Sequence, residues 1–168
     1  MLTLVIGGSA SGKSEYAESL ILASPARPRY YLATMEVYDG ESRARVARHR
    51  AMRAEKEFET IECPVNLSAL TLPRPGAVLL EDLGNLAANE LYSPRGAGAG
   101  ALDAILQGVD RLLEQCSDLV VVSNELFTGG SSYAGDTEAY LRLMADAHLA
   151  LAKKADRVCE VVCGIAQY

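Results

Sequence analysis

The residues that this 168-residue sequence lacks, or has few of, exclude several kinds of site. It contains no tryptophan, two histidines and four cysteines, and no two cysteines form a C-x-x-C pair. Neither a zinc knuckle nor a redox-active dithiol is therefore predicted. Cysteines four residues apart in one strand have Cα atoms roughly 13 Å apart, which is too far for a disulfide. We expect all four to be buried free thiols, namely Cys63, Cys116, Cys159 and Cys163.

Long apolar runs and an excess of positive charge are also missing. No stretch approaches the roughly 20 apolar residues that a membrane-spanning helix needs, and residues 1–6 carry neither the basic region nor the cleavage site of a signal peptide. The net charge is −6, whereas sequence-independent binding to nucleic-acid backbones requires a basic surface. We therefore expect a cytoplasmic protein with no membrane span and no nucleic-acid partner.

What is present is an alternation of short β-rich runs with longer segments of helical period. This alternation is typical of parallel strands joined by crossover helices, so an α/β fold is predicted. With 49% hydrophobic residues, the chain is long enough for one core and too short for two, so 1–168 should form a single domain. The expected strands are Leu2–Ile6, Arg29–Ala33, Ala77–Glu81, Leu119–Ser123 and Arg157–Cys163. The expected helices are Lys13–Ala23, Glu41–Ala54, Leu83–Leu91, Leu102–Gln115 and Thr137–Lys153, the last with Asp136 as its N-cap.

A glycine-rich segment directly after the first expected strand matches the pattern G-x-x-x-x-G-K-[ST]. Its glycines allow the backbone to wrap around a phosphate, so that amide N–H groups and the N-terminus of the following helix point at one anion. In such loops the lysine reaches the β- and γ-phosphates of a nucleotide, and the hydroxyl that follows binds Mg²⁺. We expect Lys13 to be catalytic and Ser14 to be a metal ligand. The predicted phosphate-binding residues are Gly7, Gly8, Ser9, Ala10, Ser11, Gly12, Lys13 and Ser14.

A phosphate loop of this kind also needs a carboxylate at the end of a neighbouring strand, where it organises the metal. The run Val78–Asp82 is the best such strand end and carries two carboxylates, Glu81 and Asp82. Because side chains alternate along a strand, we expect only one of them to face the nucleotide and the other to cap or contact the next helix. The pattern alone leaves both assignments open.

Positive charge is concentrated around one of the two histidines of this acidic protein. His49 lies in the segment 43–53, which contains five arginines. A neutral imidazole there can attack the α-phosphorus of a nucleoside triphosphate and expel pyrophosphate, while the arginines neutralise the developing charge. The alternative is a solvated basic helix with a surface histidine. His148, on the apolar side of the last expected helix, is expected to be a packed or capping residue without a catalytic role.

Several segments, in order along nearly the whole chain, resemble those of one enzyme family. They are Leu4–Gly8 through Ser14, Tyr31–Met35, Arg45–Arg50, Thr60–Glu62, Leu79–Glu81, Val122–Glu125, Ala155–Val158 and Val162–Ile165. The set is similar to that of the bifunctional adenosylcobinamide kinase/adenosylcobinamide-phosphate guanylyltransferases of cobalamin biosynthesis. The resemblance implies a RecA-like P-loop fold, with a mainly parallel sheet flanked by helices, and a homotrimer. Where many relatives carry a tryptophan after the histidine, this chain has Phe58.

The activity that the resemblance implies has two steps. Adenosylcobinamide is phosphorylated from a nucleoside triphosphate such as ATP, and GMP is then transferred from GTP onto adenosylcobinamide phosphate through a guanylylated histidine that matches His49. Mg²⁺ is the implied metal, with Glu81 rather than Asp82 as the carboxylate that joins Ser14. The implied contacts with guanine nucleotide are Ala33, Thr34, Met35, Arg50, Ala51, Met52, Arg53, Glu62 and Glu81.

Two other functions fit the phosphate loop taken by itself. A small-molecule kinase uses such a loop for γ-phosphate transfer alone, with His49 left as a surface residue. A regulatory NTPase uses its nucleotide state to control a partner protein, but the N/T-K-x-D motif of regulatory GTPases is absent from the sequence. Covalent labelling of the protein by α-labelled GTP distinguishes the two-step enzyme from both alternatives.

Overall fold

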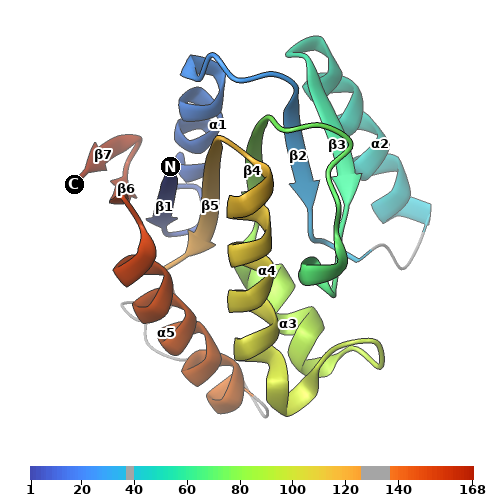
Figure 1. Ribbon diagram of the computed structural model, residues 1–168, viewed down its shortest axis with the longest axis vertical. Helices are drawn as coiled ribbons and strands as arrows, with labels where there is room; N and C mark the ends of the chain where they lie inside the picture. The colour runs from blue at the N-terminus through green and yellow to red at the C-terminus, as the bar shows by residue number, and fades with distance from the viewer. Residues whose placement is uncertain (37–39, 126–136) are drawn as a thin grey trace.

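Seven strands form one central sheet in the computed structural model, which describes residues 1–36, 40–125 and 137–168 (Figure 1). Their order across the sheet is β3-β2-β4-β5-β1-β6-β7, and neighbouring strands are parallel except in the β6–β7 hairpin. The parallel strands all point the same way, so their carboxyl ends lie along one edge of the sheet. The strands are β1 Leu2–Gly7, β2 Arg29–Ala33, β3 Phe58–Glu62, β4 Ala77–Glu81, β5 Asp118–Asn124, β6 Arg157–Val162 and β7 Ile165–Gln167.

Helices cover both faces of this sheet. They are α1 Lys13–Ala23, α2 Gly40–Glu55, α3 Leu83–Tyr92, α4 Ala101–Gln115 and α5 Thr137–Lys154, with short 3₁₀ turns at Leu67–Ala69 and Gly98–Gly100. Helix α1 packs against β1, β4, β5 and β6, whereas α3 and α4 pack against β5 and α5 against β1. Helix α2 packs beside the edge strand β3, and α3 extends beyond the edge of the sheet to which the strands point (Figure 1).

Two clusters of buried apolar side chains occupy the two sides of the sheet. Strand β2 contributes to both, because its side chains alternate. Tyr30 and Leu32 belong to the larger cluster, whereas Tyr31 packs against the smaller one. This alternation also turns Tyr31 and Ala33 towards the same side, where the candidate site forms.

The predicted α/β fold with a mainly parallel sheet is confirmed. Each of the five expected strands and five expected helices is present, with ends that differ by at most one residue. Strands β3 and β7 were not predicted. Both lie at the edges of the sheet, are short and have several exposed residues, so neither presents the continuous apolar run of a buried strand. The N-cap expected at Asp136 lies outside the described residues.

The expectation of four buried free thiols is only partly confirmed. All four cysteines are free, and Cys63 and Cys159 are buried, but Cys116 is half-buried and Cys163 is exposed. Cys163 is exposed because β6 ends at Val162, one residue earlier than expected, which places Cys163 in the turn before β7. Among the described residues, no helix is long and apolar enough to cross a membrane.

Candidate functional site

The glycine-rich loop has the strand–loop–helix setting that its pattern predicts. Strand β1 ends at Gly7, helix α1 begins at Lys13, and Gly12 between them has φ of 89°. A Cβ atom on Gly12 would also lie 3.1 Å from the Cα of Gly164 in the β6–β7 turn. Glycine is therefore required at Gly12 both by the backbone conformation and by this close approach.

Backbone hydrogen bonds from this turn and from the end of β5 hold the loop in place. The Gly164 N–H donates to the carbonyl of Ser11 at 2.7 Å, and the Glu125 N–H at the end of β5 donates to the Gly7 carbonyl at 2.9 Å. The loop borders a cavity of about 490 Å³, lined by Ala10, Ser11, Gly12, Lys13, Ser14, Glu15 and Gly164. Ser11 Oγ is buried and has no hydrogen-bond partner within the part of the chain that the structure describes. This hydroxyl is therefore able to donate a hydrogen bond to a phosphate oxygen bound by the loop.

Glu81 connects the phosphate loop with the strand ends. Its Oε1 atom contacts the Ser14 hydroxyl, and its Oε2 atom accepts a hydrogen bond from the Tyr31 hydroxyl at 3.0 Å. A serine hydroxyl and a carboxylate next to a phosphate-binding loop are hard oxygen ligands, which Mg²⁺ prefers. The residues present therefore fit a magnesium ion held jointly by protein and nucleotide.

Glu81 and Asp82 are less clearly separated than the alternation of side chains along a strand predicts. Both line a second cavity, of about 320 Å³, because β4 ends at Glu81 and strand alternation no longer applies at the next residue. Asp82 is also the N-cap of α3, as expected of the second carboxylate, and accepts the Asn85 N–H at 2.6 Å. Burial raises the pKa of the Asp82 carboxyl, and the Asn85 N–H and the positive charge of Lys13 oppose that rise.

Helix α2 presents a histidine and two arginines to this second cavity. Arg45, His49 and Arg53 are spaced four residues apart, so they follow one another along one side of the helix. All three line the cavity. The other residues that line it are Tyr31, Ala33, Met35, Val46, Glu62, Glu81, Asp82 and Asn85. His49 is exposed, which leaves its imidazole accessible to a nucleotide.

Tyr31 joins this side of α2 to Glu81. The Arg53 guanidinium carbon lies 3.7 Å from the centre of the Tyr31 ring, and Phe58 meets that ring edge-on with centroids 6.3 Å apart. Burial and then the Glu81 charge raise the pKa of the Tyr31 phenol, so it remains protonated and donates to Glu81. Phe58 is itself buried in the core, where it supports Tyr31.

The remaining predicted guanine contacts are distributed over both sides of α2 and over the end of β2. Arg50 forms an ion pair with Glu62 at 2.9 Å, with both side chains about half exposed. Ala51 lines a separate surface cavity with Arg50 and Glu62, and Met52 is 62% exposed. Thr34 is fully buried, and its hydroxyl donates to the Asp82 carbonyl and accepts from the Asp82 N–H, both at 2.8 Å. Thr34 can therefore shape the cavity chiefly through its backbone.

His148 is a packed residue, as expected. Its Nε2 atom lies 2.6 Å from the Ser123 hydroxyl at the end of β5. Burial lowers the pKa of the His148 imidazole, and the neighbouring Glu125 carboxylate opposes this. At neutral pH the ring is therefore predominantly neutral, which suits a hydrogen bond to a buried hydroxyl.

Five residues that line the cavity are absent from the predicted site: Tyr31, Arg45, Val46, Asp82 and Asn85. A signal for two of them was present. Tyr31 is two residues before Ala33 on a strand and therefore shares its side, and Arg45 is four residues before His49 on a helix. Asp82 and Asn85 needed the actual geometry of the β4–α3 junction, which no periodicity describes.

The family model and the related proteins agree over nearly the whole chain. The family model for cobinamide kinase / cobinamide phosphate guanyltransferase matches residues 3–168, which include the whole site. The bifunctional adenosylcobalamin biosynthesis protein CobU of Salmonella typhimurium is 31% identical over 179 residues, with 98% of this chain and 97% of that protein covered. The corresponding protein CobP of Pseudomonas aeruginosa is 31% identical over 170 residues, with coverages of 98% and 95%. The flagellar accessory protein FlaH from Methanocaldococcus jannaschii, a crystal structure, is 8% identical with a TM-score of 0.48, and the match covers 98% of this chain and 74% of that one.

Proposed function

The chain belongs to the cobinamide kinase / cobinamide phosphate guanyltransferase family, and we propose that one site built around the phosphate loop serves both reactions. In the first, adenosylcobinamide is phosphorylated from a nucleoside triphosphate. In the second, GMP from GTP is joined to adenosylcobinamide phosphate, giving adenosyl-GDP-cobinamide and pyrophosphate. The observation that carries the proposal is the contact between Ser14 and Glu81, which joins the phosphate loop to the cavity that His49 lines.

In the guanylyl transfer, His49 is the covalent nucleophile. A neutral ring nitrogen of His49 attacks the α-phosphorus of GTP, so that an N–P bond forms while the bond to the β-phosphate oxygen breaks and pyrophosphate leaves. A phosphate oxygen of adenosylcobinamide phosphate then attacks the same phosphorus, breaks the N–P bond and frees the imidazole. Arg45 and Arg53, which line the same cavity, oppose the negative charge that develops on the phosphorus oxygens.

In the kinase step, the phosphate loop carries the chemistry. Its backbone amides and Lys13 hold the β- and γ-phosphates while the hydroxyl of adenosylcobinamide attacks the γ-phosphorus, and the bond from that phosphorus to the β-phosphate oxygen breaks. Ser14 and Glu81 would hold Mg²⁺, which supplies positive charge to the phosphate oxygens when bound. The same anchor presents the α-phosphorus of GTP to His49.

Incubation of the wild-type protein with α-³²P-GTP and Mg²⁺ tests this proposal. We expect the protein to acquire a label that is labile in acid and stable in base, as a phosphoramidate is. A chase with adenosylcobinamide phosphate should remove the label and form a labelled cobinamide product. Absence of any label, together with transfer of γ-label to adenosylcobinamide, would show a kinase without guanylyltransferase activity. Slow hydrolysis with no transfer to either acceptor would instead indicate a regulatory NTPase.

Replacing Tyr31 with phenylalanine should raise the Mg²⁺ concentration that both reactions require. The substitution keeps the ring that Arg53 covers but removes the hydroxyl that orients Glu81. A hydrogen bond to a charged group contributes about 1.5–3 kcal/mol, so we expect the Mg²⁺ concentration for half-maximal activity to rise by about tenfold. The measurement is the Mg²⁺ dependence of both reactions.

Tyr30→Phe is the matched control for this substitution. The Tyr30 hydroxyl is also buried, but it donates to the Arg74 carbonyl at 2.9 Å on the other side of β2. This variant should lose stability and keep the Mg²⁺ dependence of the wild type. If both variants need the same Mg²⁺ concentration for half-maximal activity, the Tyr31 hydroxyl does not orient Glu81 for Mg²⁺ binding.

A further inference from the structure

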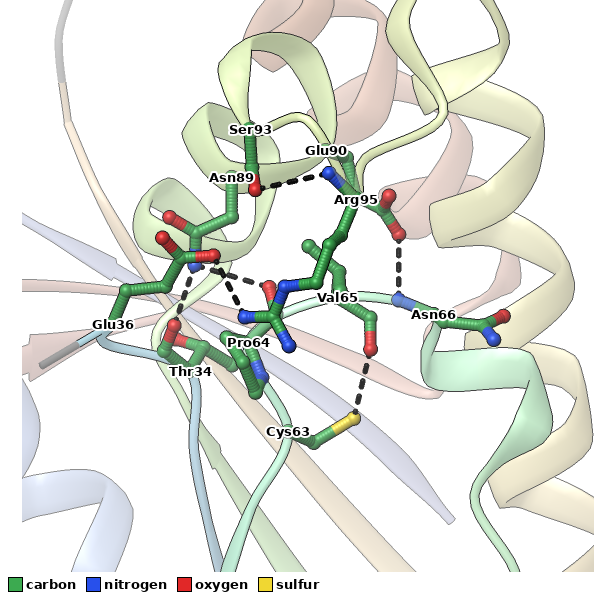
Figure 2. A network of polar contacts seen from close by, with 10 residues as sticks. All are labelled: Thr34, Glu36, Cys63, Pro64, Val65, Asn66, Asn89, Glu90, Ser93 and Arg95. Atoms are coloured by element: carbon green, nitrogen blue, oxygen red, sulfur yellow. Dashed lines mark hydrogen bonds and ion pairs between the residues drawn. The ribbon is translucent and has the colours of Figure 1, made fainter.

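The last turn of α3 fastens the loops that leave β2 and β3. Asn89 lies between these loops and donates both hydrogens of its amide nitrogen to backbone carbonyls (Figure 2). The acceptors are the carbonyl of Thr34, at 2.7 Å, and the carbonyl of Pro64, at 3.0 Å. Since carbonyl oxygens only accept, the contacts also establish which end of the amide carries the nitrogen.

This bridge begins where hydrogen bonds of the sheet no longer connect the two segments. Strands β2 and β3 pair through Ala33 and Glu62, and the Cys63 N–H makes one more bond to the Ala33 carbonyl at 2.9 Å. Beyond that point the loops separate, and the Asn89 amide connects them instead. Among side chains of this size, only a primary amide offers two donors on one uncharged nitrogen.

The two anchored carbonyls flank the predicted guanine contacts. Thr34 stands between Ala33 and Met35, and Pro64 follows Glu62 by two residues. Ala33, Met35 and Glu62 line the His49 cavity. The position of the Thr34 backbone therefore sets one wall of the cavity, and the position of Pro64 helps to set the wall that carries the Glu62 carboxylate.

We propose that Asn89 is a positioning residue for guanine recognition, which keeps the loop after β2 and the Glu62 carboxylate at the spacing that a guanine base requires. The inference rests on the proposed function of the cavity. The Watson–Crick edge of guanine carries two adjacent donors, N1–H and the 2-amino group, and a carboxylate accepts both. Hypoxanthine lacks the 2-amino group. A site that holds the Glu62 carboxylate at the right distance from the loop after β2 therefore distinguishes the two bases, whereas a site in which either has moved does so poorly.

Its neighbour Glu90 serves as an internal comparison. The Glu90 side chain is 2% exposed and accepts the N–H groups of Asn66 and Ala97, each at 3.0 Å. It thus holds loop segments that do not line the cavity, with Asn66 visible beside it in Figure 2. Loss of one of these bonds should lower stability, while the Asn89 amide still holds the carbonyls of Thr34 and Pro64.

Equilibrium binding of GDP, IDP and ADP to the purified protein tests the inference, because diphosphates cannot guanylylate His49. We expect the wild type to bind GDP about tenfold or more tightly than IDP. Asn89→Asp keeps the shape of the side chain but loses both donors and places an acceptor against two carbonyls, so its preference for GDP should fall to within about threefold. ADP, held chiefly by the phosphate loop, should bind both proteins alike. Asn89→Ala removes the donors without adding charge and carries the same test if the aspartate variant does not fold.

Glu90→Gln should lower the melting temperature and keep the wild-type ratio of GDP to IDP affinity. The inference is overturned if the wild type does not distinguish GDP from IDP, if the Asn89 variants keep its preference, or if they weaken GDP, IDP and ADP equally. The labelling experiment with α-³²P-GTP is separate from these measurements. Failure to label would therefore count against the guanylyltransferase and leave the result on base recognition standing.

Discussion

Replacing His49 with asparagine is expected to abolish the covalent label from α-³²P-GTP and to reduce formation of adenosyl-GDP-cobinamide by about 10³-fold or more, as loss of a catalytic nucleophile does. The asparagine amide is too weak a nucleophile to displace pyrophosphate. Phosphorylation of adenosylcobinamide should persist, since the phosphate loop, Ser14 and Glu81 are untouched. His49 is exposed, so the free energy of unfolding should change by no more than about 0.5 kcal/mol.

The other histidine provides the control for this result. His148→Asn removes the ring that lies against Ser123 in the interior. It should lower the melting temperature while leaving the label in place. If His49→Asn accepts as much label as the wild type, His49 is not the nucleophile. If it loses the kinase activity to the same extent as the label, the two reactions do not divide between His49 and the phosphate loop as proposed.

Replacing Lys13 with methionine is expected to impair both reactions together. Methionine approximates the length of the lysine side chain but lacks the charge that holds the β- and γ-phosphates. Loss of one such electrostatic contact commonly lowers the rate by about 10²–10³-fold, and we expect this loss in the kinase assay and in the rate of self-labelling. Within the part of the chain that the structure describes, Lys13 Nζ donates a hydrogen bond to the Gly8 carbonyl at 3.1 Å, inside the loop itself. The rest of the fold should therefore be little affected.

Lys154→Met is the matched substitution away from the phosphate loop. Lys154 is at the end of α5 and pairs with Asp110 on α4. Both activities should stay near those of the wild type. A Lys13→Met protein that retained rapid self-labelling would show that the phosphate loop does not present GTP to His49, and would separate the two reactions into different sites.

Most of the fold could be predicted from the sequence because most of its strands are buried on both faces. Such strands, like β1, β4 and β5, appear as continuous apolar runs. Strand β3 could not be recognised in this way, since it lies at the edge of the sheet and three of its five residues are polar. Its absence from the prediction matters for the site, because β3 places Glu62 in register with Ala33.

The site was predictable where the chemistry follows from adjacent residues. The phosphate loop is continuous in sequence, and both its position and its conformational need for Gly12 follow from that pattern. That Glu81 and Asp82 line the same cavity was not predictable, because the rule of alternating side chains ends where β4 ends. The hydrogen bonds of Tyr31 and Asn89 were not predictable either, since they join residues far apart in the chain.

By itself, the sequence determined that this chain is an α/β protein with a phosphate loop, and its motifs pointed to the family to which it belongs. Strand–loop–helix patterns and glycine spacing are local properties, so they can be recognised from neighbouring residues alone. Only the tertiary structure decided which side chains meet at the loop. Parallel pairing brings the ends of β1, β2 and β4 to one edge, and α2 then lies over β3 with Arg45, His49 and Arg53 facing the carboxylates. These contacts join residues tens of positions apart, so their geometry exists only once the sheet has formed.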